Sequence, residues 1–176
     1  RLGPGPVEAP RRQNDAGVYV MDQVNRAFQP EVLVVPTGAS VKFPNSDSVS
    51  HQVYSFSPAK RFQLPLYRGK PYSPVNFDTP GIVTLGCNIH DNMIGWILIT
   101  DADWFGRSDK DGNWRAASLP AGGYELSIWH PRLREPAARL QSKLHLDSGE
   151  TGRVEFRASK AMRPAPLTGK SLEWDY

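Results

Sequence analysis

The sequence predicts an all-β protein made of two successive sets of short strands. Its 176 residues include 15 glycines and 16 prolines, a usage typical of chains with many tight turns. Between the turns, β-branched and aromatic residues recur with a period of two, as in strands that bury one face. No stretch approaches the roughly 18 apolar residues of a membrane-spanning helix. These patterns favour packed β-sheets over a helical bundle and indicate no transmembrane segment.

The two ends of the chain show no such period. Residues 1–16 hold three prolines and three arginines, and we expect them to form a flexible arm. The chain begins at Arg1 rather than at a methionine, so we expect a mature or trimmed form from which any export signal has been removed. Residues 159–176 form a C-terminal tail whose last apolar side chains alternate, as in a segment that docks on a sheet edge or stays free. These side chains are Leu172, Trp174 and Tyr176.

Residues 17–100 carry the first set of strands. Turn residues bound them, for example at Pro36-Thr37-Gly38 and at Pro80-Gly81. Strands at this spacing are typical of a sandwich or a barrel. The expected strands lie at Val18–Val20, Val32–Val35, Val41–Phe43, Gln52–Phe56, Ile82–Leu85 and Trp96–Ile99.

Residues 101–158 carry the second set, after a turn-rich stretch with four aspartates within eleven residues. This stretch predicts a boundary or linker, because it lacks the regular spacing and terminal Glu of an EF-hand calcium loop. We expect the strands to form a second, smaller sandwich. They lie at Trp114–Leu119, Tyr124–His130, Arg139–Leu146 and Gly152–Ala158.

The charge balance is too even to indicate a nucleic-acid partner. Lys and Arg number 21 and Asp and Glu 18, for a net charge of +3 and an isoelectric point near 9.1. Residues 57–77 are locally basic and contain no acidic residue. This stretch is either a solvated face or a patch that steers an acidic redox partner. Its cations are Lys60, Arg61, Arg68 and Lys70.

The segment around Cys87 combines three metal-binding side chains at short spacing. Cys87, His90 and Met93 follow one another as C-x2-H-x2-M, and we place them on one loop between two strands. His51 lies 36 residues upstream, at the start of another expected strand. Thiolate and thioether ligands select copper(I), and two imidazoles, one thiolate and a weak axial thioether form the blue-copper geometry. The four residues therefore predict a one-electron copper site.

Ordinary structural roles are the alternative for each of these residues taken alone. A lone cysteine is usually a small buried hydrophobe, and a lone methionine usually packs. Structural zinc usually takes more than one cysteine, whereas this chain has one. The remaining histidines have weaker claims: we expect His130 in a core or domain interface and His145 on the surface.

Two stretches of the first block resemble cupredoxins of the plastocyanin and amicyanin type. They are FQPEVLVVPTGASVKFPNSDSVSHQVYSF and FDTPGIVTLGCNIHDNMIGWILIT, and the resemblance covers about residues 17–100. It implies a Greek-key β-sandwich with one mononuclear copper ion that cycles between Cu(I) and Cu(II). By the same resemblance, His51, Cys87 and His90 are the strong equatorial ligands and Met93 is the axial ligand. His90 would then be the port through which electrons pass.

The sequence departs from the cupredoxin pattern at two positions. Gln52 stands where many relatives have an Asn that braces the ligand loops, which puts that bracing in doubt. Asp91 stands where many have a Pro after the second His, and its carboxylate could tune the potential or the docking surface, or compete as a ligand.

The second block resembles a transthyretin-like or carboxypeptidase-regulatory-like β-sandwich. The resemblance rests on DKDGNWRAASLPAGGYELSIWHPRL and covers about residues 101–158. It implies a structural or interaction module and no activity. The fusion of the two blocks resembles exported bacterial proteins, which implies a periplasmic or otherwise exported protein.

Three functions follow as hypotheses. The first is an electron carrier that passes single electrons between redox partners through the copper site, and not an enzyme. The second is a protein that binds copper for sensing, storage or delivery, and the third is an accessory module of a larger redox enzyme. The low number of Met and His residues, 3 and 4, favours the carrier. The partner's identity and the oligomeric state stay open.

Overall fold

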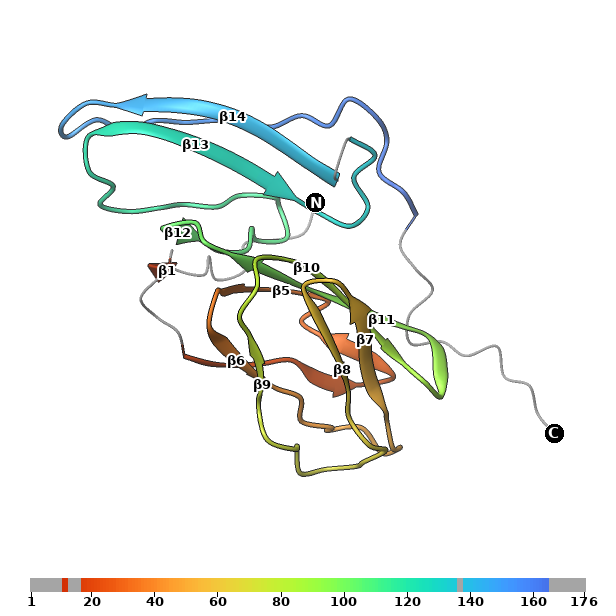
Figure 1. Cartoon of the computed structure of the whole chain (residues 1–176). Coiled ribbons are helices and arrows are strands. Elements are labelled where there is room, and N and C mark those ends of the chain that lie inside the picture. The colour runs from red at the N-terminus through yellow and green to blue at the C-terminus, as the bar shows by residue number, and fades with distance from the viewer. Residues whose placement is uncertain (1–10, 13–16, 136–137, 165–176) are drawn as a thin grey trace. The chain divides into compact units, whose positions relative to one another are not determined.

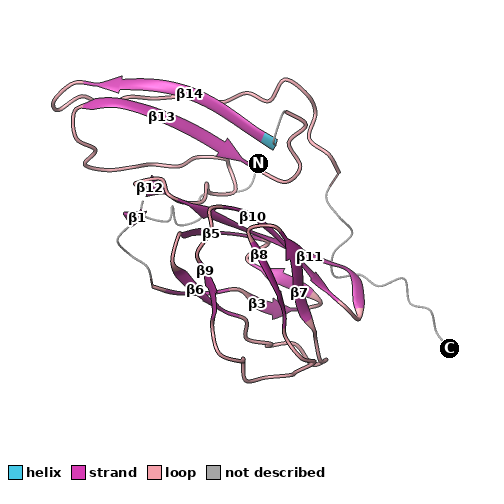
Figure 2. Cartoon of the chain, viewed as in Figure 1, coloured by secondary structure: helices cyan, strands magenta, loops and turns pink. Residues whose placement is uncertain are grey.

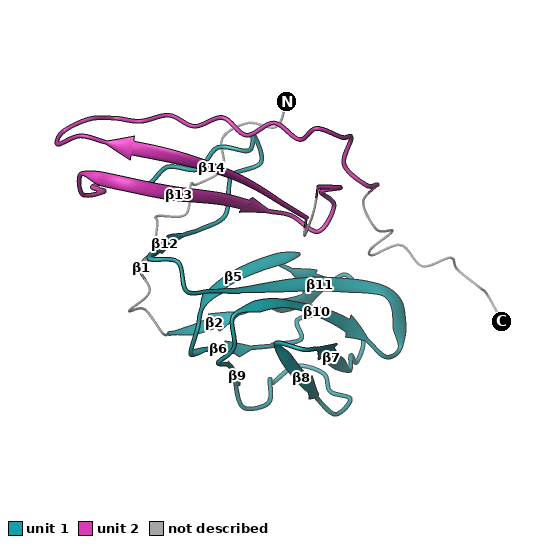
Figure 3. Ribbon diagram, turned by 45° about the horizontal axis from the view of Figure 1, so that its top comes forward, with its two compact units in different colours: residues 1–116, 166–176 teal, residues 117–165 magenta. Residues whose placement is uncertain are grey.

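The computed structural model describes residues 11–12, 17–135 and 138–164 of the chain. Apart from a short helical turn at Ala138, these residues form strands, turns and loops, which confirms the predicted all-β class (Figure 2). None of the described residues forms a helix of the length and hydrophobicity needed to cross a membrane. The chain forms two compact units, residues 1–116 with 166–176 and residues 117–165 (Figure 3). The predicted domain limits at 17–100 and 101–158 stay a prediction.

The first unit is a sandwich of a five-stranded and a three-stranded sheet (Figure 1). The larger sheet has the order β5 (Val32–Pro36), β11 (His90–Thr100), β10 (Gly81–Cys87), β7 (Val53–Ser57) and β8 (Lys60–Gln63). The smaller has the order β2 (Val18–Val20), β6 (Ala39–Lys42) and β9 (Val75–Phe77). Two further pairs join β3 (Asp22–Val24) to β4 (Ala27–Gln29), and β1 (Arg11–Arg12) to β12 (Trp104–Phe105).

The core lies between the two sheets of the first unit. Alternate residues of β10 and β11 are buried, which is the period of two that the sequence shows. Phe62 of β8 and Phe77 of β9 meet edge to face, with ring centroids 6.1 Å apart, and so join the two sheets directly. Cys87 and Met93 belong to the same buried cluster. Two of the four side chains predicted to bind the metal therefore belong to the packed core.

The hairpin of β10 and β11 differs from the predicted ligand loop. Gly86 pairs with Ile94, but Cys87 pairs with His90, so the register shifts by three residues across a bulge at 91–93. Only Asn88 and Ile89 form the turn. The placement of His90 and Met93 on a loop is therefore wrong: both lie on β11, because strand pairing continues as far as Cys87.

The described part of the second unit contains one two-stranded sheet. It pairs β13 (Gly122–Trp129) with β14 (Arg139–Leu146), close to two of the four predicted strands. The strand predicted at Trp114–Leu119 does not form, and Ser118 has a φ of 58°, which no strand residue adopts.

The strand predicted at Gly152–Ala158 also does not form. A Cβ added at Gly152 would lie 2.6 Å from Leu146 Cδ2 and 3.0 Å from both δ-carbons of Leu144. The segment therefore passes over the side chains of β14 instead of extending its hydrogen-bond ladder. The second, transthyretin-like sandwich stays a prediction. The alternating residues predicted near the C-terminus (Leu172, Trp174, Tyr176) lie outside the described residues.

Candidate metal centre

Three side chains from separate strand ends meet at one end of the sandwich. Cys87 is the last residue of β10, and His90 is the first residue of β11 and its direct neighbour across the hairpin. His51 precedes β7, whose Val53 pairs with Cys87. The backbone of His51 is held in turn by Tyr67, through N–H···O bonds of 2.9 and 3.0 Å in the two directions. The sheet order β11-β10-β7 thus places the three side chains next to one another.

The donor atoms of these side chains form a compact triangle. Nδ1 of His51 lies 3.1 Å from Nδ1 of His90, and each lies 3.6 Å from Sγ of Cys87. In such a triangle the point equidistant from the three atoms lies about 2.0 Å from each, close to metal–nitrogen bond lengths and somewhat shorter than metal–sulfur ones. Among the described residues, these three form the group of His, Cys or carboxylate side chains able to hold a metal ion together.

The chemistry of the donor set fits one copper ion. A single thiolate with two imidazoles matches the three strong ligands of a blue-copper site. Structural zinc sites usually take two to four cysteines among four ligands, whereas this cluster holds one. Asp91, considered above as a competing ligand, has an exposed side chain and is not a member of the cluster. The cluster therefore fits the predicted copper cofactor through His51, Cys87 and His90.

The cluster is closed on one side and open on the other. The His51 side chain has no exposed surface and Cys87 is buried, whereas His90 is half-buried. Ile89, beside His90 in the turn, is 48% exposed. His90 is thus the member of the cluster that reaches solvent, as expected of an electron port.

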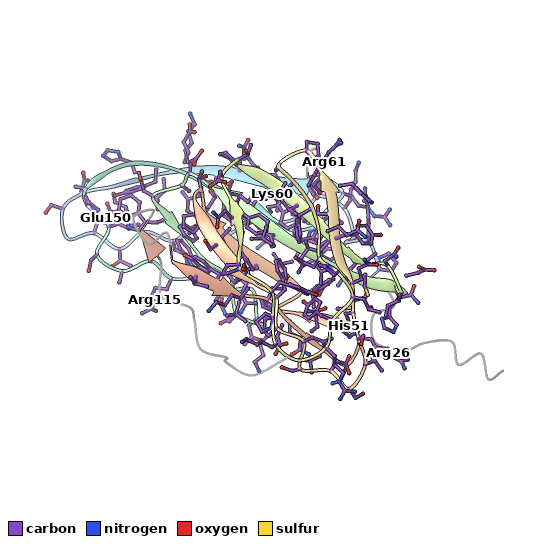
Figure 4. The ribbon with its side chains drawn as sticks, turned by 60° about the horizontal axis from the view of Figure 1, so that its bottom comes forward. Arg26, His51, Lys60, Arg61, Arg115 and Glu150 are labelled. Carbon is purple, nitrogen blue, oxygen red and sulfur yellow. The ribbon has the colours of Figure 1, made fainter. Side chains whose placement is uncertain are left out.

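Asp47 fixes the ring of His51 from behind. Its Oδ2 lies 3.1 Å from Nε2 of His51, on the side of the ring opposite the cluster. Burial by itself raises the pKa of Asp47, but hydrogen bonds from the Arg26 backbone N–H and from the His51 ring outweigh it and lower the pKa. Asp47 is therefore an anion at neutral pH. Figure 4 shows Arg26 and His51 at the same end of the unit.

The electrostatics of His90 favour its neutral form. Burial lowers the pKa of His90, and the neighbouring His51 ring and Arg26 act in the same direction, whereas Asp47 opposes them. A neutral imidazole keeps a lone pair on one nitrogen. His90 is therefore ready to bind a metal without first losing a proton at neutral pH.

Gln52 takes over the bracing that the sequence comparison put in doubt. Its backbone carbonyl accepts the N–H of Asn88 at 3.1 Å, and its side-chain Oε1 accepts Nδ2 of Asn88 at 2.9 Å. Asn88 lies in the turn between Cys87 and His90. The segment that carries His51 is therefore tied to the turn that joins Cys87 to His90.

Met93 is buried, with 1% of its surface exposed, and packs in the core cluster. It lies within the bulge of β11, three residues after His90. Its role as the axial ligand stays a prediction.

Gly86 and Gly95 flank this segment, and both allow close packing. A Cβ at Gly86 would lie 2.7 Å from the Tyr54 ring, and one at Gly95 would lie 2.9 Å from Phe28.

Two residues of the site escaped the sequence analysis. Asp47 lies four residues before His51 in a serine-rich turn, and this spacing was the available signal. Tyr67 is buried behind His51, donates its hydroxyl to the Phe43 carbonyl and accepts from Nε2 of Gln23. Burial raises the pKa of Tyr67 to about 12.

The other candidate residues lie outside the cluster. His130 is half-buried and accepts the Arg132 N–H on Nδ1 at 3.2 Å. His145 is exposed, as predicted, and lies 3.7 Å from Asp147. In the aspartate-rich stretch, Asp109 accepts the backbone N–H groups of Asp111 and Asn113, which is the hydrogen bonding of a turn.

Comparison with known proteins gives structural likenesses alone. No protein-family model matches the sequence, and no curated protein matches it. A copper-containing nitrite reductase from Thermus scotoductus SA-01 is 26% identical over 48% of this chain and 22% of its own, with a TM-score of 0.45. A purple cupredoxin from Nitrosopumilus maritimus is 22% identical over 47% of this chain and 99% of its own, with a TM-score of 0.42.

A reduced amicyanin variant is 21% identical over 54% of this chain and 95% of its own, with a TM-score of 0.43. The chain thus spans about a fifth of the length of the nitrite reductase and nearly all of the two smaller proteins. Because each TM-score lies below 0.5, we base the function on the geometry of the cluster.

Proposed function

We propose that this protein is a type 1 copper protein that passes single electrons between redox partners. His51, Cys87 and His90 are the strong ligands of one copper ion, and Met93 is its weak axial ligand. The observation that supports this proposal is the triangle of two Nδ1 atoms and one Sγ, with sides of 3.1, 3.6 and 3.6 Å. When bound, copper supplies the one-electron couple.

The protein's own residues would hold this ligand set fixed during electron transfer. Cys87 is paired on both sides, by β7 and β11, and His51 is anchored by Tyr67 and Asp47. The turn between Cys87 and His90 is tied to Gln52. Donors that cannot move keep the coordination similar in both oxidation states. Burial of His51 and Cys87 excludes water, and the half-buried His90 is the contact with a partner.

Only two of the four cations in the basic stretch, residues 57–77, lie near the site and support an acidic redox partner. Lys60 and Arg61 pair with Ser57 and Phe56, at the end of β7 away from His51 (Figure 4). Arg68 and Lys70 are exposed near the site: Arg68 Nη1 donates to the Ser48 carbonyl at 3.0 Å, and the intervening Gly69 bonds to Asn45. Steering of an acidic partner would therefore come from Arg68 and Lys70.

A matched pair of double variants tests this steering. Arg68→Gln with Lys70→Gln and Lys60→Gln with Arg61→Gln each remove two positive charges. We expect the first pair to lower the electron-transfer rate and to flatten its ionic-strength dependence, and the second pair to change neither. Equal effects of the two pairs would remove the local steering.

Burial of the site favours an electron carrier over a copper-delivery protein, because cargo has to enter and leave. Two of the three donors are buried, and the chain has few Met and His residues outside the cluster. An accessory module of a larger redox enzyme would use the same site, and is the alternative. An electron carrier of this kind suits a periplasmic or otherwise exported location.

The absorption spectrum of the copper-loaded protein tests the proposal. We expect a strong thiolate-to-copper charge-transfer band that is absent in Cys87→Ser, since serine lacks the sulfur donor. A colourless protein that binds copper(II) would contradict it.

A further inference from the structure

We propose that Asp47 is a positioning residue of the metal centre, one that keeps the His51 proton on Nε2 and favours the oxidised metal by its charge. The effect of the Asp47 charge on the oxidised metal rests on the proposed function. The position of the His51 proton does not, because it concerns the protein's own side chains. Asp47 is not one of the proposed ligands, and it lies outside the sequence motif that contains Cys87, His90 and Met93.

The contacts of Asp47 hold its carboxylate in one orientation. Oδ2 accepts the Arg26 N–H at 2.6 Å as well as facing Nε2 of His51 at 3.1 Å, and Oδ1 accepts the Ser48 N–H at 2.9 Å. The backbone N–H of Asp47 donates to Oδ1 of Asn45 at 3.0 Å. Asn45 is itself buried and donates from Nδ2 to the carbonyls of Val49 and Tyr67. The carboxylate is therefore fixed before any metal binds.

The β3–β4 turn supplies one of these contacts through an unusual backbone. Asn25 and Arg26 both have positive φ, 53° and 57°, as in a type I′ turn between two strands. This conformation is disfavoured for Arg, yet it delivers the Arg26 N–H to Asp47. The turn thus helps to hold the carboxylate behind His51.

The surroundings of His51 let the Asp47 carboxylate determine which ring nitrogen of His51 carries the proton. A neutral imidazole carries its proton on one nitrogen, and the other nitrogen has the lone pair. An ionised carboxylate accepts only, so Nε2 must donate to Asp47. The His51 side chain has no exposed surface, so bulk water does not compete. Nδ1, which faces Cys87 and His90, is left with its lone pair and could bind a metal held by the three side chains.

The same carboxylate acts on the redox equilibrium through its charge. With one thiolate ligand, the metal group carries one more positive charge when oxidised than when reduced. The Asp47 side chain is only 10% exposed, so its field at the site is weakly screened. A negative charge there stabilises the oxidised form more and lowers the reduction potential. Asp91 also neighbours a ligand, but it is exposed and screened by solvent.

The first test needs neither copper nor a variant. Imidazole ¹⁵N NMR of the metal-free wild-type protein, at a pH where the ring is neutral, reports which nitrogen of His51 carries the proton. We expect Nε2–H. A ring with its proton on Nδ1 would overturn the assignment. In Asp47→Ala, which lacks the acceptor, we expect a mixture of the two forms and a copper affinity lower by about 10–100-fold. An unchanged tautomer together with unchanged affinity would overturn it.

The second test uses two matched charge removals, Asp47→Asn and Asp91→Asn, in the copper-loaded protein. We expect Asp47→Asn to keep the thiolate-to-copper band and to shift the equilibrium toward the reduced form by about tenfold, which is 59 mV for one electron. Asp91→Asn should shift it by no more than about twofold, because exposed charges are screened. Equal shifts in the two variants would overturn the charge role. If the wild-type protein did not bind copper, the proposed function would be contradicted instead. The NMR result on the position of the His51 proton would still hold.

Discussion

The two imidazoles of the cluster lie in different surroundings. His51 is completely buried, with Tyr67 paired to its backbone and Asp47 bonded to its ring. His90 is half-buried at the start of β11, directly after a two-residue turn and next to the exposed Ile89. One side of the site therefore fixes the donors, and the other side meets the solvent. Both are needed in a centre that passes electrons without changing its ligands.

Removal of each imidazole in turn should give the largest difference between the closed side of the site, at His51, and the open side, at His90. We expect His51→Ala and His90→Ala both to lose the thiolate-to-copper band of the copper-loaded protein, because each lacks one of three strong donors. Added imidazole should restore the band in His90→Ala, whose gap opens to solvent, and not in His51→Ala, whose gap is closed. Absorption spectra with and without imidazole provide the measurement, with His145→Ala as an unaffected control. Equal rescue of both variants would show that the two imidazoles do not differ in access to solvent.

Tyr67, on the closed side of the site, should make the folding stability of the protein sensitive to alkaline pH. Its pKa is raised in the folded protein to about 12, mainly by burial, so the unfolded chain releases the proton first as pH rises. The stability that depends on Tyr67 is complete below pH 10, its usual pKa, and is lost as pH rises toward 12.

The loss expected for Tyr67 is about 2–3 kcal/mol, two pKa units at roughly 1.4 kcal/mol each. Urea unfolding of the metal-free protein between pH 9 and 12 measures it. Tyr67→Phe, which has no hydroxyl to ionise, should show a flatter profile than the wild type. Parallel profiles would contradict the assignment.

The hydrogen bond between the Asn88 and Gln52 side chains joins the two sides of the site. Its removal should have the smallest effect on folding stability. The side-chain bond from Asn88 to Gln52 is exposed, so its contribution to folding stability should be about 0.5–1 kcal/mol. A double-mutant cycle of Gln52→Ala and Asn88→Ala, followed by urea unfolding, measures the coupling. A coupling energy of zero would show that the backbone bond from Asn88 to Gln52 suffices on its own.

The sequence was informative where burial imposes a period. Alternate residues of β7, β10 and β11 are buried, because one face of each strand lies in the core. Strand β5 follows instead from the continuous apolar run Val32–Val35 before a turn. The cluster of His51, Cys87 and His90 follows from the types and spacing of its donors, which few other chemistries require. Both inferences depend on local composition, which a single sequence displays.

Features set by long-range geometry were not predictable in this way. The bulge at 91–93 depends on where the pairing of β10 with β11 shifts, and no local pattern marks it. Asp47 lies in a serine-rich turn and becomes important only because Arg26 and His51 approach it from other parts of the chain. In the second unit, Val154 and Phe156 alternate as in a strand, yet the segment packs on side chains and makes no ladder.

X-ray absorption at the copper edge identifies the atoms that bind the metal in each oxidation state. In both oxidation states of the loaded protein, we expect one sulfur and two nitrogens as the near neighbours of copper, with distances that change little. The same measurement on Cys87→Ser should lose the sulfur. Absence of a short copper–sulfur distance in the wild-type protein, or a change of ligands upon reduction, would contradict a site built for electron transfer from His51, Cys87 and His90.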